Sequence, residues 1–266
     1  MPHDRRQLGL PGLSSGRQAP PASGPRVEVV LCHLSPHECD SSLRASPLSA
    51  EERRVAARFV FAEHRRRFIQ RHTALRELLG RYCGMAPREI QLAHGSHGRP
   101  WVGNACGAVD FSLSHSGDWA AVAFSTDSWV GIDLERLDGT GWQALVPTTM
   151  TEAEQRQLAA TPPALRAGRF FAHWTAKEAF MKLNGLGMSL APDSIEVVPG
   201  AEADRGCDIA VAVNHPAGLA IARASLTRIE APAELSCTLA TALPPGVLTV
   251  TRWPPQPSLR VSPYLA

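Results

Sequence analysis

The chain has 266 residues, of which 44% are hydrophobic and 20% are charged, so it is long and apolar enough to bury a core. This composition excludes a disordered chain, a coiled coil and a disulfide-stapled miniprotein. The formal net charge of +2 gives no overall bias towards nucleic acid. No apolar run approaches the ~20 residues that a membrane span requires.

Both ends of the chain are rich in proline. We expect residues 1–26 to form a flexible leader, and residues 244–266 to form a Pro-rich tail that lies over the surface or is partly disordered. The N-terminus lacks the apolar core of a secretion signal, so we expect a cytosolic protein whose six scattered cysteines are reduced thiols. The cluster Cys32, His33, His37 and Cys39 fits no standard ligand spacing, so we do not predict zinc.

The body divides into two α+β halves, which we place at 27–130 and 131–243. In the first, a strand is predicted over Val27 to His33, and Ser49 with Glu52 forms a capping box that opens a helix near Ala50. A second helix is predicted from about Glu63 to Tyr82 by its apolar stripe. Short strands then follow around Phe111 to Ser114, Trp119 to Phe124 and Trp129 to Glu135.

The second half repeats this order of helix followed by strands. Thr151 and Glu154 form another capping box, and a helix is predicted from about Arg169 to Leu183. Four apolar stretches predict strands: Ser194 to Val198, Asp208 to Val213, Leu219 to Leu226, and Leu235 to Ala242. The same order of helix and strands in both halves indicates two similar α+β subdomains.

Two carboxylates share one face of a predicted strand. In Val130 to Glu135, Ile132 and Leu134 point to one side while Asp133 and Glu135 point to the other. Adjacent carboxylates repel each other, and a hard cation such as Mg²⁺ would relieve that repulsion. A solvated strand face is the alternative.

A third carboxylate lies on the apolar stripe of the later helix. Glu178 follows Trp174 by one helical turn and precedes Lys182 by another. Burying a carboxylate among aromatic side chains is costly unless a cation compensates it. A simple Glu–Lys helix pair explains Lys182, but it leaves the apolar surroundings of Glu178 without an explanation.

A run of serines surrounds one histidine at the end of a predicted strand, in Ser112 to Gly117. Ser114 and His115 point to opposite faces of a strand, so they make a poor nucleophilic pair, and no GxSxG elbow is present. Histidine beside serines and a glycine is suited to holding a phosphate. The alternative is a turn histidine with a structural role.

Arginines crowd the first two predicted helices. They suit bidentate phosphate contacts, although a solvated helix face is the default interpretation of such a charge run. The interleaved aromatic residues of an RNA-binding platform are missing. The arginines concerned are Arg53, Arg54, Arg58, Arg65, Arg66, Arg67, Arg71 and Arg76, with Arg99 in a later Gly-Arg-Pro loop.

Three ordered blocks of this sequence resemble the 4′-phosphopantetheinyl transferases, specifically the larger monomeric type that activates peptide and polyketide synthases. The blocks are Gly98-Arg99-Pro100 leading to Phe111-Ser112-Leu113-Ser114-His115-Ser116, then Gly131-Ile132-Asp133-Leu134-Glu135, then Trp174-Thr175-Ala176-Lys177-Glu178-Ala179-Phe180-Met181-Lys182. The resemblance covers roughly Ser49 to Val198 and continues more weakly to about Ala242.

The resemblance implies a pseudo-dimer of two α+β subdomains with the active site at their interface. It implies transfer of the phosphopantetheinyl arm of coenzyme A to a serine of an apo carrier protein, with release of adenosine 3′,5′-bisphosphate. By position, the Mg²⁺ ligands would be Asp133, Glu135 and Glu178. The coenzyme contacts would be Ser114, His115, Arg99, Lys182 and the adjacent Lys177.

Some details of the family pattern differ here. The family often has a basic residue for the 3′-phosphate where Val55 aligns, so Arg54 or Arg58 would take that role. The resemblance implies that Glu178 or a metal-bound water takes the proton of the carrier serine, with His115 and Lys182 assisting the transfer. The expected partners are coenzyme A and acyl, peptidyl or aryl carrier domains, with no nucleic acid, no membrane and a monomeric state.

Two other functions use the same residues. A Mg²⁺-dependent phosphohydrolase or nuclease would use water as the nucleophile and would need no carrier. A coenzyme A binding protein without chemistry would not depend on Glu178.

Overall fold

The structure is a computed structural model of the whole chain, and it describes residues 24–35, 45–104, 109–138, 140–199, 207–211 and 223–254. Helices and mostly antiparallel sheets make up these segments, in agreement with the expected α+β class. None of the helices in the described segments is both long and apolar enough to cross a membrane.

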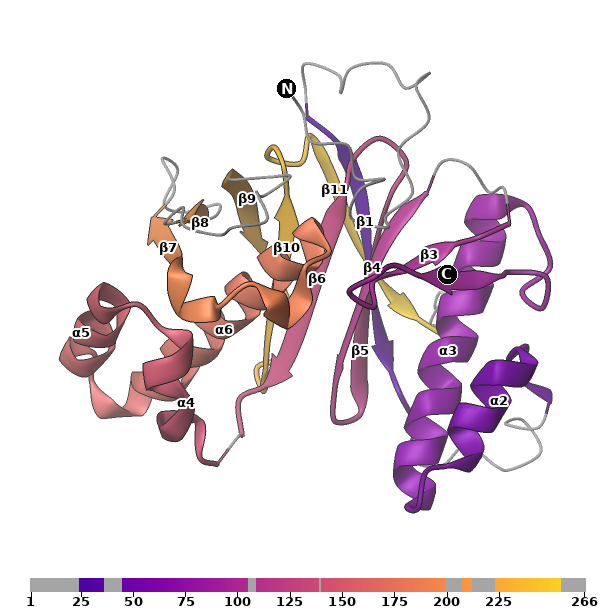
Figure 1. Cartoon of the computed structure of the whole chain (residues 1–266), viewed down its shortest axis with the longest axis horizontal. Helices are drawn as coiled ribbons and strands as arrows, with labels where there is room; N and C mark the ends of the chain where they lie inside the picture. Colours follow the sequence, from indigo (N-terminus) through magenta and orange to yellow (C-terminus); the bar gives the residue numbers. More distant parts are fainter. Residues whose placement is uncertain are drawn as a thin grey trace, which may run out of the picture.

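The first sheet has the strand order β11-β1-β5-β4 (Figure 1). β1 pairs antiparallel with β5 and parallel with β11, and β4 leads through a tight turn into β5, its other antiparallel partner. The strands span Arg26–His33 (β1), Asp110–Ser116 (β4), Trp119–Ser125 (β5) and Val247–Trp253 (β11).

Two helices and a small hairpin belong to this half. Helix α2 (Ala50–Ala57) begins at the predicted capping box, in which Ser49 and Glu52 each bond the other's backbone N–H. Helix α3 (Ala62–Cys83) ends at Gly84, whose left-handed backbone suits glycine. The hairpin pairs β2 (Leu92–His94) with β3 (Pro100–Val102).

The second sheet has the order β6-β10-β9-β8-β7 and is antiparallel throughout. Its strands span Val130–Arg136 (β6), Ile195–Pro199 (β7), Cys207–Val211 (β8), Arg223–Arg228 (β9) and Leu235–Thr241 (β10). The helices of this half are α4 (Trp142–Thr149), α5 (Glu152–Ala160) and α6 (Pro163–Asn184), followed by the short turns η2 (Gly187–Ser189) and η3 (Pro192–Ser194).

The two sheets face each other, and a long helix covers the outer face of each (Figure 1). Between the sheets, side chains of β1 and β5 such as Val29 and Ala123 pack against Ile132 and Leu239. Helix α3 packs on the outside of the first sheet through Leu75 and its neighbours, and α6 covers the second sheet. This burial supplies the main driving force for folding.

Three expectations require correction. The predicted Pro-rich tail contains β11, so residues 247–253 are part of the first sheet. Helix α6 begins at Pro163, about six residues before the predicted start near Arg169, because proline is well tolerated in a first helical turn. Cys83 is disulfide-bonded, so the cysteines are not all reduced, whereas Cys32 and Cys237 are free and buried.

Candidate functional site at the junction of the two sheets

The carboxylates of β6 lie on the face predicted from strand alternation. Ile132 and Leu134 are fully buried between the sheets, and Asp133 on the opposite face reaches α6. Asp133 is only 2% exposed, which requires compensation of its charge.

Asp133 receives that compensation on one oxygen. Its Oδ1 accepts hydrogen bonds from the Ser114 hydroxyl at 2.7 Å and the Lys182 ammonium at 2.6 Å, and Lys182 also donates to Ser114 at 3.0 Å. The other oxygen, Oδ2, is buried and has no hydrogen-bond partner within the described residues. An unpaired carboxylate oxygen of this kind marks a position where a further positive group would be stabilised.

Glu135 and Glu178 are electrostatically coupled to Asp133. Burial raises the pKa of both carboxyl groups, and the charge of Asp133 raises each pKa further. Hydrogen bonds from Ser116 and Trp174, together with the charge of Lys182, lower the pKa of Glu135 and so oppose the increase. Two of the three predicted carboxylates therefore disfavour their charged forms in the protein without a cation.

The described segments contain no three His, Cys, Asp or Glu side chains that are already arranged as a metal site. Lys182 occupies part of the coordination space of Asp133. Any cation would share Asp133 with this ammonium group.

His115 lies beside the cluster on β4. The ring keeps some solvent exposure, yet its surroundings remove enough water to lower its pKa to about 4, with Arg71, Lys182 and His72 adding repulsion. His115 is therefore neutral at neutral pH in the free protein, and it offers an N–H donor rather than a positive charge.

Arg71 is the strongest of these repelling charges, and its guanidinium lies 4.9 Å from the centre of the Phe68 ring. Burial lowers the pKa of Arg71 to about 10, so it stays charged at neutral pH. Within the described residues it has no carboxylate partner. The sequence identified Arg71 only as one of many arginines; the spacing of Phe68, Arg71 and His72 on one helical face was the available signal.

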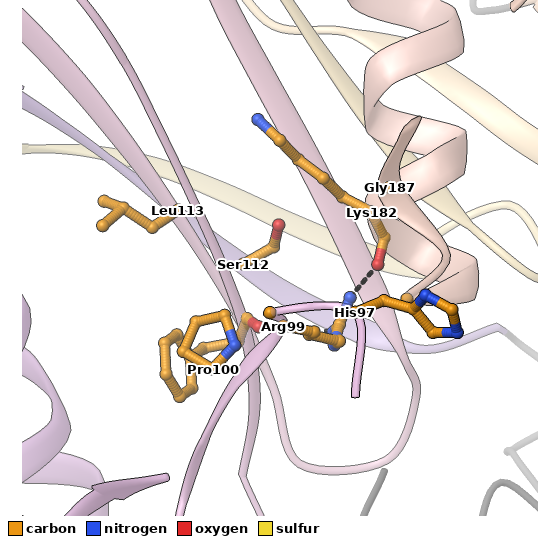
Figure 2. A pocket seen from close by; sticks show the side chains of 10 residues that line it. His97, Arg99, Pro100, Ser112, Leu113, Lys182 and Gly187 are labelled. Atoms are coloured by element: carbon orange, nitrogen blue, oxygen red, sulfur yellow. Dashed lines mark hydrogen bonds between the residues drawn. The ribbon is translucent and has the colours of Figure 1, made fainter. Parts of the chain in front are cut away.

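Arg99 lines a pocket of roughly 180 Å³ between β4, the loop before β3 and the end of α6. Its guanidinium is committed to protein groups, since Nη2 bonds Asp110 at 2.7 Å and the Val130 carbonyl at 2.9 Å, and Nη1 bonds the Lys182 carbonyl. Figure 2 shows this last contact, with the Lys182 ammonium extending away from it. The pocket is below the ~300–1,000 Å³ of typical ligand pockets, so it would hold only part of a large ligand.

The structure does not bring Lys177 to this cluster. Lys177 is fully buried, and its ammonium donates to Glu154 at 2.5 Å and to the Thr149 carbonyl at 2.7 Å. Arg54 on α2 and Arg58 directly after its end are exposed. No hydrogen bond or ion pair within the described segments joins either one to Asp133, Ser114 or Lys182.

Both halves of the chain match family models. Residues 33–127 match the model described as 4′-phosphopantetheinyl transferase, N-terminal, and residues 129–213 match the model of the 4′-phosphopantetheinyl transferase superfamily. A solved structure, that of Thermotoga maritima holo-[acyl-carrier-protein] synthase, aligns with 43% of this chain and 62% of its own chain, at 17% identity and a TM-score of 0.35.

Curated relatives extend across the junction of the halves. The 4′-phosphopantetheinyl transferase HetI of Nostoc sp. is 35% identical over 167 residues, which cover 61% of this chain and 70% of that protein. The 4′-phosphopantetheinyl transferase Sfp of Bacillus subtilis (strain 168) is 30% identical over 163 residues, which cover 57% of this chain and 71% of that protein. The chain therefore belongs to the 4′-phosphopantetheinyl transferase superfamily and is an enzyme of its larger, HetI- and Sfp-like type.

Proposed function

We propose that the protein transfers the 4′-phosphopantetheine arm of coenzyme A to a serine of an apo carrier protein and releases adenosine 3′,5′-bisphosphate. The observation that carries this proposal is the meeting of Ser114 from β4, Asp133 from β6 and Lys182 from α6 at one point. We further propose that the two halves form a pseudo-dimer with the active site at their interface.

The residues present suit a Mg²⁺ ion. The buried Oδ2 of Asp133 lacks a partner among the described residues, and Glu135 and Glu178 have raised pKa values that an adjacent cation would lower again. Carboxylate oxygens are the protein ligands that Mg²⁺ prefers, together with substrate phosphates. When bound, the ion would neutralise the carboxylates and the diphosphate of coenzyme A.

The transfer forms a bond between the carrier serine oxygen and the phosphorus next to the pantetheine arm, and it breaks the bond from that phosphorus to the oxygen of the leaving nucleotide. We assign Lys182 to the diphosphate, because its ammonium is a quarter exposed next to Asp133. His115 and the carboxylate-free Arg71 would add a hydrogen bond and a charge to the phosphates. Glu178 would accept the serine proton.

The test is to incubate the protein with coenzyme A, Mg²⁺ and a panel of apo carrier domains, and to measure the intact mass of each carrier. The proposal expects a gain of one phosphopantetheine on at least one carrier, and no gain with Asp133→Asn, whose thermal unfolding should remain cooperative. Asp133→Asn removes mutual repulsion among the carboxylates, so we expect folding to survive the change.

Two further assays, ester hydrolysis without a carrier and coenzyme A binding, separate the two other functions. Phosphate release from model esters without any carrier would indicate a hydrolase. Tight coenzyme binding that survives Glu178→Gln, without mass gain on any carrier, would indicate a binding protein. The monomeric state, the cytosolic location and the lack of nucleic-acid and membrane partners stay predictions.

A further inference from the structure

Short polar side chains of β4 bond the backbone of β6, although the two strands belong to different sheets. The N–H of Val130 donates to Asp110 Oδ2 at 2.8 Å, that of Ile132 to Ser112 Oγ at 3.1 Å, and that of Arg136 to Ser116 Oγ at 3.1 Å. The side chains of β4 thus take the place of the backbone carbonyls of a neighbouring strand.

The first of these contacts is also an ion pair. Asp110 Oδ2 accepts a second hydrogen bond, at 2.7 Å, from Arg99 Nη2, which also donates to the Val130 carbonyl at 2.9 Å. The side chains of Arg99 and Asp110 are 7% and 16% exposed. Together, the two side chains therefore bind both the N–H and the carbonyl of Val130.

These contacts belong to a network of hydrogen bonds that links β4, β6 and α6 at the candidate site. Arg99 Nη1 bonds the carbonyl of Lys182, and the ammonium of the same lysine bonds Asp133 on β6 at 2.6 Å. Val130 precedes Asp133 by three residues on that strand. A displacement of β6 at Val130 would therefore separate Lys182 from Asp133.

We propose that Asp110 is a positioning residue that, through Arg99, holds the start of β6 against the end of α6 and so keeps Lys182 on Asp133. This inference rests on the proposed function for its kinetic consequences only. Asp110 has no hydrogen bond to Ser114, Asp133 or Lys182 within the described residues, so it acts through Arg99 and Val130. Arg99 is then a cross-link between the halves, in addition to lining the pocket.

The lysine content of the chain allows a direct test. Lys177 and Lys182 are the two lysines of the whole sequence. An amine-acylating reagent, followed by peptide mass spectrometry, therefore reports the accessibility of Lys182, with the fully buried Lys177 as an internal control of folding. In Asp110→Asn we expect Lys182 to react several-fold faster than in the wild-type protein while Lys177 stays protected.

Asp127→Asn is the matched control. Asp127 also caps backbone in the first half, accepting from the Ser125 hydroxyl at 2.8 Å and the Arg26 N–H at 3.2 Å, but it has no contact with Arg99 or β6 in the described segments. Its substitution should lower the melting temperature without changing the labelling of Lys182 or the transfer rate.

Kinetics give the second measurement. Asp110→Asn should lower kcat for carrier loading about tenfold, or ~1.4 kcal/mol, while the Kd for coenzyme A changes less than about twofold. Arg99→Lys should behave alike, because one ammonium group cannot span the four acceptors of the guanidinium. Arg99→Lys also serves as the test if Asp110→Asn does not fold.

Unchanged labelling of Lys182 in both folded variants would overturn the proposal. A raised Kd for coenzyme A with unchanged kcat would also overturn it and would assign the pair to coenzyme binding. If the wild-type protein loads no carrier, the proposed function fails, but the labelling experiment still decides whether Asp110 places Lys182.

Discussion

Lys177 and Lys182 lie on the same helix and have different surroundings. Lys182 is partly exposed and contacts Asp133, whereas Lys177 is fully buried against Glu154, which is 1% exposed. Burial lowers the pKa of Lys177, and Glu154 opposes that effect. We therefore assign Lys177 to the stability of the second half and Lys182 to the site.

Substitution of one member of this buried pair should destabilise the protein strongly. Lys177→Met leaves the Glu154 carboxylate buried with fewer partners, a change that typically costs ~3–5 kcal/mol. Urea unfolding should show this loss. The double variant Lys177→Met with Glu154→Gln should recover most of it, because the neutral amide needs no buried cation and its oxygen remains an acceptor for the backbone N–H groups that Glu154 binds. An unchanged unfolding free energy in the single variant, or a raised Kd for coenzyme A in the folded double variant, would contradict the assignment.

At the residue scale, the sequence predicts what local periodicity determines. Strand alternation placed Asp133 and Glu135 on one face, and helix spacing placed Glu178 one turn from Lys182. Lys177 was wrongly associated with the site because it is adjacent to Glu178 in sequence, although neighbours on a helix point about 100° apart. Its partner Glu154 belongs to another helix, α5, so no spacing rule could reveal it.

At the scale of elements, β6 and α6 approach each other closely because Gly131 has no side chain. A Cβ at this position would lie 2.0 Å from the Ala179 carbonyl oxygen and 2.6 Å from the Leu183 nitrogen. Both atoms belong to the backbone of α6, which carries Glu178 and Lys182. This glycine therefore sets the distance between the strand and the helix that form the site.

Gly131→Ala should push α6 away from β6. We expect a loss of ~1–3 kcal/mol in unfolding free energy, as in other overpacked cores, together with a fall in carrier loading. Gly168→Ala in α6 is the control, because nothing lies within 4 Å of its added Cβ. This variant should be as stable as the wild-type protein or more stable, since alanine is favoured over glycine in a helix by up to ~1 kcal/mol. Equal stability of the two variants would contradict the close-approach argument.

Glu52 joins α2 to α3 and makes that junction sensitive to acid. Burial opposes the charge of Glu52, but hydrogen bonds from His72 and Ser49 and the charge of Arg76 lower its pKa from 4.5 to about 2. Because the folded-state pKa is depressed, the stabilisation is complete above pH 4.5 and is lost as the pH falls towards 2.

The contribution of Glu52 amounts to about 3 kcal/mol. Urea unfolding across this acid range should therefore show a steeper loss of stability in the wild-type protein than in Glu52→Gln, which is already weaker at neutral pH. Parallel pH profiles for the two proteins would show that Glu52 does not have a depressed pKa.

Elements with strong local signals were predicted well, and elements that depend on tertiary contacts were not. The two capping boxes gave the starts of α2 and α5 because they are local hydrogen-bonded motifs. Helix α4 contains Pro147, a residue that argues against a helix, and it was missed. Strand β11 was interpreted as a Pro-rich tail because its partner, β1, lies at the opposite end of the chain.

At the scale of the whole molecule, the chain crosses back from the second half to the first. After β10 in the second sheet it enters β11, which pairs in parallel with β1 from Arg26 to Cys32. Leu248 packs into the core between the sheets, and the Trp253 indole N–H donates to Glu77 on α3 at 3.3 Å. The last strand thus ties the two halves together in addition to the contacts between β4 and β6.

Removal of β11 should therefore weaken the first half, where most of its contacts lie. We compare a chain that ends at Leu243 with one that ends at Pro254, because the longer chain retains every residue of β11. The shorter chain should melt at a lower temperature, and its β1 amides from Val27 to Leu31 should exchange hydrogen faster, since β1 then has β5 as its single partner strand. Equal melting temperatures and equal β1 protection in the two chains would show that β11 does not stabilise the sheet. The junction of the halves would then depend on the contacts between β4 and β6 and on the core between the two sheets.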